Sequence, residues 1–190
     1  MTVGWPLFRS VESGGEDDYP IIQPRDLAGV FLADSSALAR VRLPRAAARY
    51  RVAEGDLVLL NRGAAGPTKV SIVASGVAGA IATSNLTLIR PQHHVLLGEA
   101  LLAYLLSTSG QAELQRRSAT STVRALTVDQ LGSVRVPVPH RATQERIVAL
   151  WRATEGSYVE AIAAAEDRRT LGVAVLDQLF QSGTAPRFTQ

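Results

Sequence analysis

The sequence predicts an α+β fold, in which a β-rich domain is followed by a long C-terminal α-helix able to form a coiled coil. The 190 residues contain 46% hydrophobic and 19% charged side chains, which is an ordinary globular composition. Short apolar segments separated by turn residues follow one another from residue 19 to residue 90. From residue 142 the apolar spacing changes to the threes and fours of a helix. The chain therefore has room for one domain plus an appended helix.

These patterns divide the chain into four parts. Residues 1–18, with small residues and a run of acids, are expected to be an exposed N-terminal segment. Residues 19–141 form the β-rich domain, residues 142–183 the long spacer or dimerisation helix, and residues 184–190 a tail. Strands are predicted in the domain at residues 19–23, 41–43, 57–60, 69–74, 79–83 and 86–90.

The end of the predicted domain is more helical. Residues 98–117 favour one or two helices with a break near residues 107–110. A polar loop follows, and then a short helical turn that Thr127 is suited to cap. Residues 134–139 are predicted as a strand, which their two prolines would confine to an edge.

The predicted C-terminal helix has an apolar stripe. About 40 residues at roughly 1.5 Å per residue span about 60 Å, longer than a domain of this size can cover, so part of the helix is expected to project and to pair with another helix. Gly156, Gly172 and Arg168 weaken that stripe, which leaves packing against its own domain as the alternative. The proposed dimerisation residues are Ile147, Trp151, Thr154, Tyr158, Ala161, Ala165, Val175 and Leu179.

Charge is segregated along the chain. Residues 1–20 have a net charge of −3, residues 21–141 have fourteen basic against seven acidic side chains for a net of +7, and residues 142–190 have a net of −1. The positive middle indicates a polyanionic partner. Lys69 is the one lysine among twenty basic residues, and the nineteen arginines suit bidentate contacts to phosphate or guanine. A GC-rich genome would also favour arginine over lysine.

The sequence offers little for catalysis. Without cysteine there is no disulfide, thiolate metal site or cysteine nucleophile, and the adjacent His93 and His94 cannot chelate as an i, i+4 pair would. The glycines at 63 and 66 lack the Gly-Lys-Ser/Thr ending of a phosphate-binding loop. We therefore expect no catalytic residues, no metal and no cofactor. Neither a signal peptide nor a membrane span is found, so a cytoplasmic location and no membrane partner are expected.

Several segments resemble one half of the specificity subunit of type I restriction-modification enzymes. The similar segments, in the family's order, are residues 19–27, 54–63, 83–91, 121–126, 136–139 and 144–148. The resemblance implies that residues 19–141 are a target-recognition domain for double-stranded DNA and that the helix is a spacer. It also implies a non-catalytic subunit that recruits a DNA adenine methyltransferase subunit and a restriction or translocase subunit to a bipartite site. Full-length relatives have two such domains, so the single domain here predicts a half-subunit acting as a homodimer or a fragment.

The resemblance does not supply the residues that contact DNA, which are predicted from their chemistry. The strongest candidate is the loop from Asn61 and Arg62 to Lys69. It combines an amide and a forked guanidinium donor with small residues, which allow the backbone to approach DNA closely. The full set of predicted DNA-binding residues is Arg25, Arg42, Arg45, Arg49, Asn61, Arg62, Lys69, Asn85, Arg116, Arg117, Ser121, Thr122 and Arg124.

Two other functions remain open at this point. The chain could be a specificity or assembly adaptor of another DNA-modification or phage-defence complex, with the helix as its main interaction surface. It could also be an enzyme whose active site is dispersed along the sequence.

Overall fold

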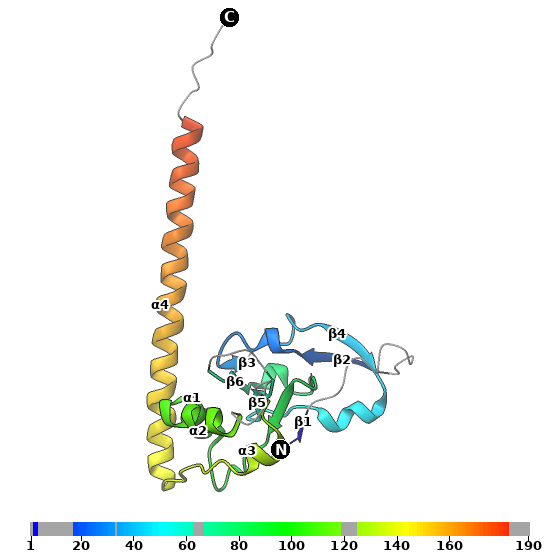
Figure 1. Cartoon of the computed structure of the whole chain (residues 1–190). Coiled ribbons are helices and arrows are strands. Elements are labelled where there is room, and N and C mark those ends of the chain that lie inside the picture. The colour runs from blue at the N-terminus through cyan, green and yellow to red at the C-terminus, as the bar shows by residue number, and fades with distance from the viewer. Residues whose placement is uncertain (1, 4–16, 33, 63–66, 119–124, 183–190) are drawn as a thin grey trace, which may run out of the picture. The chain divides into compact units, whose positions relative to one another are not determined.

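The computed structural model describes residues 2–3, 17–32, 34–62, 67–118 and 125–182. The chain separates into two compact units, Met1–Val148 and Ala149–Gln190. The first unit contains all the described strands and the short helices, and the second contains most of the long C-terminal helix (Figure 1). A β-rich domain followed by a long helix is thus confirmed.

The larger sheet of the first unit has five strands in the order β1-β8-β5-β6-β3. Its neighbours are antiparallel except β3 and β6, which run parallel. One face packs into a core that includes Val58, Val73 and Leu86. The strands are β1 (Thr2–Val3), β3 (Phe31–Leu32), β5 (Leu57–Leu60), β6 (Val70–Val73) and β8 (Leu86–Ile89).

A second sheet has the order β4-β2-β7. Strand β2 (Asp17–Ile22) pairs antiparallel with β4 (Arg40–Leu43) through its first four residues and parallel with β7 (Ile81–Ala82) through its last two. Its core contains Tyr19, Ile21, Leu43, Ala47 and Ile81. Three 3₁₀ helices complete the connections, namely η2 (Pro24–Asp26), η3 (Arg45–Tyr50) and η4 (Ser75–Val77).

The predicted helical region 98–117 forms two helices, α1 (Gly98–Leu106) and α2 (Thr108–Ser118), which break at Ser107. The Ser107 hydroxyl accepts a hydrogen bond from the Gly110 amide at 3.2 Å, so it caps the start of α2. A side chain at residue 110 would lie 2.0 Å from the Tyr104 carbonyl oxygen, and glycine is therefore required at this close approach. Helix α3 (Val128–Gly132) begins with the predicted Thr127 cap.

The predicted strand at residues 134–139 is wrong. These described residues form no strand. Pro137 and Pro139 have no amide hydrogen, so alternate ladder positions have no donor, and the segment passes directly into the long helix.

The N-terminal segment predicted over residues 1–18 contributes to both sheets at its ends. Thr2 and Val3 pair with Thr87 and Leu88, and Asp17 and Asp18 begin β2. Backbone hydrogen bonds to β8 and β4 explain why both ends of this segment form strands, which its polar composition does not predict.

Helix α4 (Arg141–Ser182) has 42 residues, one residue longer at each end than the periodic pattern from 142 to 181. Its first turns lie in the first unit, where the fully buried Gln144 makes three hydrogen bonds. Gln144 Oε1 accepts from the Leu97 amide, and Nε2 donates to the carbonyls of Val95 and Pro139, each at 2.9 Å. Within the described residues, no helix has the length and apolar character that crossing a bilayer demands.

Candidate nucleic-acid interface

The predicted loop between β5 and β6 has its two cations at the ends that the structure describes. Arg62 and Lys69 are both exposed, whereas residues 63–66 lie outside the described part of the chain. Strands β5 and β6 are antiparallel neighbours, and the Leu60 amide donates to the Lys69 carbonyl at 2.9 Å. The two cations therefore stand on either side of one hairpin end.

Asn61 is half-buried and is held in place by its side-chain amide. Its Nδ2 donates to the Ser84 carbonyl at 3.2 Å and to the Thr87 hydroxyl at 3.1 Å. Its backbone amide donates to the carbonyl of Asn85, another predicted DNA-binding residue, whose own side chain is exposed. Asn61 thus fixes the β7–β8 turn beside Arg62, and its amide donors are already engaged.

The third predicted group approaches the same place. Arg62 forms an isolated antiparallel bridge with Ala125, and the Leu126 amide donates to the Asn61 carbonyl at 2.8 Å. Ser121, Thr122 and Arg124 lie outside the described residues, but the chain leaves that loop at Ala125. The structure therefore joins three segments that are far apart in sequence: the β5–β6 hairpin, the β7–β8 turn and the segment entering α3.

Arg116 and Arg117, also predicted to bind DNA, are paired with a buried acid that sequence reasoning did not select. Glu113 is 8% exposed and contacts Arg116 at 2.5 Å and Arg117 at 2.9 Å. The hydrogen bond from Arg117 and the charges of Arg116, Arg117 and Arg135 hold the pKa of Glu113 below its ordinary value, while burial opposes them. The i, i+3 and i, i+4 spacing was the available signal for these pairs.

We expect Glu113→Gln to change the pH dependence of stability. Because the pKa of Glu113 is lower in the folded state than in the unfolded state, where it is near 4.5, the ionised side chain stabilises the fold at pH values above 4.5. This stabilisation is lost as the pH falls through the folded-state pKa. Urea unfolding midpoints measured between about pH 7 and about pH 3 should therefore decline less for Glu113→Gln than for the wild type. The exposed Glu54→Gln is the control. An equal acid-side decline in Glu113→Gln and the wild type would contradict the assignment.

A separate basic group lies on the smaller sheet and η3. Arg42 is exposed because alternate residues of β4 face away from Leu43 and its core. Arg49 donates to the Tyr50 hydroxyl at 2.7 Å and lies 4.8 Å from that ring's centre, and Arg45 also has an interaction partner. Arg25 is exposed and lies 3.8 Å from Asp26.

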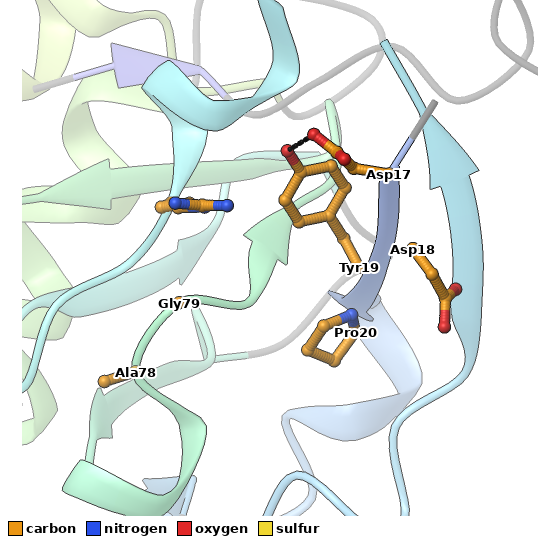
Figure 2. A pocket seen from close by; sticks show the side chains of 7 residues that line it. Asp17, Asp18, Tyr19, Pro20, Ala78 and Gly79 are labelled. Carbon is orange, nitrogen blue, oxygen red and sulfur yellow. Dashed lines mark hydrogen bonds between the residues drawn. The ribbon is translucent and has the colours of Figure 1, made fainter. Parts of the chain in front are cut away.

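A groove of about 430 Å³ lies beside β2. The Tyr19 hydroxyl donates to Asp17 at 3.0 Å, as Figure 2 shows, and the Arg51 guanidinium lies 5.0 Å from the Tyr19 ring centre. The groove is lined by Asp17, Asp18, Tyr19, Pro20, Arg51, Ala78 and Gly79. Asp18 is in turn paired with Arg40 at 2.6 Å, so the charged side chains of this lining have partners within the protein.

No metal centre is indicated by the described residues, which contain no group of three or more His, Asp or Glu side chains able to hold an ion. The best-buried acid, Asp56, is held by Arg90 through two hydrogen bonds of 2.8 and 2.6 Å and by the Ala53 amide at 2.7 Å. This pair fixes the turn before β5, which is a structural role.

The predicted dimerisation residues of α4 differ in exposure. Ile147 and Trp151 are half-buried, whereas Thr154, Tyr158, Ala161, Ala165, Val175 and Leu179 are exposed. The stripe also includes three large apolar residues that the sequence prediction missed: Ile162, Leu176 and Phe180 are 40%, 54% and 81% exposed. Ile162 is four residues after Tyr158, Leu176 is fourteen residues, or about four turns, after Ile162, and Phe180 is four residues after Leu176, and this helical spacing was the signal.

Solved structures with a similar fold include the following two. The crystal structure of the HsdS subunit from Thermoanaerobacter tengcongensis has a TM-score of 0.59 at 16% identity, over 92% of this chain and 45% of that chain. A structure reported for complex assembly and conformational transition of the type I R-M system has a TM-score of 0.63 at 15% identity, over 100% and 48%. This chain therefore spans about half the length of the chains it matches. No family model and no curated protein sequence matches it.

Proposed function

We propose that the chain is a non-catalytic DNA-specificity subunit, or half-subunit, of a type I restriction-modification system. The observation that supports it most is the convergence of the Arg62–Lys69 hairpin, the Asn85 turn and the segment that enters α3 from Ala125. Exposed cations beside a turn can contact phosphates, and forked donors can contact base edges. The fold shared with the HsdS subunit, over 92% of this chain, supports the same conclusion.

The proposed partners are double-stranded DNA, a DNA adenine methyltransferase subunit, a restriction or translocase subunit and a second copy of this chain. The exposed apolar stripe of α4 supports the homodimer, because large apolar side chains on one helix face are normally covered. Two copies related by a two-fold axis would present two recognition domains to a bipartite DNA site.

The central test is selection of binding sites from a random-sequence duplex pool, with and without a type I methyltransferase subunit. We expect an enriched motif. Arg62→Ala combined with Lys69→Ala should weaken binding to that motif at least tenfold, since each lost contact costs about 1–3 kcal/mol. Electrophoretic retardation measures the effect.

Arg146→Ala combined with Arg152→Ala removes the same charge from exposed positions of α4 that lie off the apolar stripe, and is the matched control. It should leave motif binding nearly unchanged. Failure to enrich any motif, even with the methyltransferase subunit, would contradict the proposal. The second candidate function, favoured by the exposed stripe of α4, is an assembly adaptor. An adaptor would still assemble fully with its partners when Arg62 and Lys69 are replaced by alanine.

A further inference from the structure

Each cation of the proposed hairpin follows a residue that an amide side chain holds in place. Asn61, immediately before Arg62, is fixed by its own side chain to Ser84 and Thr87. Thr68, immediately before Lys69, is fixed by Gln111 from α2, 43 residues away in sequence.

The Gln111 contact is a closed pair of hydrogen bonds. The Thr68 amide donates to Gln111 Oε1 at 2.7 Å, and Gln111 Nε2 donates to the Thr68 carbonyl at 3.0 Å. Nε2 also donates to the Leu105 carbonyl at 2.8 Å, near the end of α1. One side chain thereby engages both backbone polar groups of a hairpin residue and orients its peptide planes.

Helix α2 is a rigid support for this contact. Leu114 is fully buried, Gly110 packs against the Tyr104 backbone, and Ser107 caps the first turn. Gln111 lies between Gly110 and Leu114 on the same short helix. The position of the hairpin end at Lys69 is therefore fixed by the helical part of the domain as well as by its own strand.

We propose that Gln111 is a positioning residue for DNA sequence selectivity, which acts by fixing Thr68 and thus the position of Lys69 relative to Arg62. This inference rests on the proposed DNA-recognition function. Direct base contacts need donor–acceptor distances near 3 Å, whereas the attraction between cations and phosphates tolerates small displacements. Loosening the hairpin should therefore reduce selectivity and spare non-specific binding.

The test compares Gln111→Met with Gln115→Met in the full chain. Methionine retains the length and helix propensity of glutamine but cannot form these bonds. Gln115 is one turn further along α2, and its side chain is exposed. The readouts are affinity for the selected motif, affinity for a scrambled duplex, the salt dependence of both, and hydrogen exchange at the Thr68 amide.

For Gln111→Met we expect faster Thr68 exchange and a loss of about tenfold in the ratio of motif to scrambled affinity. Scrambled-duplex affinity and its salt slope should stay within about twofold of wild type, because no charge is removed. Gln115→Met should match the wild type in every readout. If folding of Gln111→Met is impaired, Gln111→Glu, which retains the acceptor for Thr68, should still lower the ratio.

Two outcomes would overturn the inference. Faster Thr68 exchange with an unchanged affinity ratio would mean that Gln111 holds the hairpin without affecting selectivity. A parallel fall of both affinities in both Gln111 variants would mean a general structural role. If the wild type itself selects no motif, the proposed function fails first, and that result differs from either of these.

Discussion

Replacing Gln144 by alanine is expected to lower the free energy of unfolding of the first unit by about 3 kcal/mol. The side chain is 2% exposed and satisfies the Leu97 amide and the carbonyls of Val95 and Pro139. Alanine would leave these three backbone groups without their partner and open a cavity where the side chain was. Urea unfolding, together with hydrogen exchange at the Leu97 amide, measures the effect.

Two further substitutions sharpen this prediction. Gln144→Glu retains the acceptor for Leu97 but would direct a carboxylate oxygen at two carbonyls, so it should also destabilise the unit strongly. Thr143→Ala, at the exposed preceding position of α4, is the matched control and should stay within about 0.5 kcal/mol of the wild type. If the Leu97 backbone amide exchanged as slowly in Gln144→Ala as in the wild type, the hydrogen bond from Leu97 to Gln144 would not be what protects that amide.

The second large effect concerns the exposed stripe of α4. Combining Ile162→Glu with Leu176→Glu should convert the proposed dimer into a monomer, because two charges per chain would enter an apolar contact without partners. Loss of the second recognition domain should then weaken binding to a bipartite site about 100-fold or more, which is the gain that linked binding commonly provides. Sedimentation equilibrium measures the first effect and retardation of a two-site duplex the second.

The matched control places the same charges on the other side of the helix. Ala163 and Ala174 are exposed, and the 3.6-residue turn sets both away from Ile162 and Leu176. Ala163→Glu with Ala174→Glu should remain dimeric and bind the two-site duplex normally. A wild-type chain that is monomeric at micromolar concentration would refute the homodimer, and an equal loss in both double variants would point to helix destabilisation instead.

Local pattern was sufficient for most of the fold. Alternating and apolar runs located β5, β6 and β8, because these strands bury side chains that only apolar residues can fill. The period of threes and fours located α4 to within one residue at each end. Thr127 was identified as a cap because its hydroxyl and the Gln130 amide are close in any helix start.

The candidate interface was only partly predictable. Arg62 and Lys69 were selected from residue type and turn context, and both are exposed beside one hairpin end. The amide donors of Asn61, by contrast, are engaged by Ser84 and Thr87, and Arg116 and Arg117 share Glu113. Residue type indicates what a side chain can bind, whereas its partner depends on which other segment folds against it.

By itself, the sequence determined the order of elements, the basic middle region and the apolar stripe of the long helix, since each depends on spacing between near neighbours. Only the tertiary structure decided that Arg62 meets Ala125, that Gln111 holds Thr68 and that Gln144 is buried. Apart from the bond between Gln144 and Pro139, these contacts join residues more than 40 positions apart. At such a site the partners of the polar side chain are backbone groups, which every residue has whatever its type. Composition and periodicity therefore do not predict the pairing.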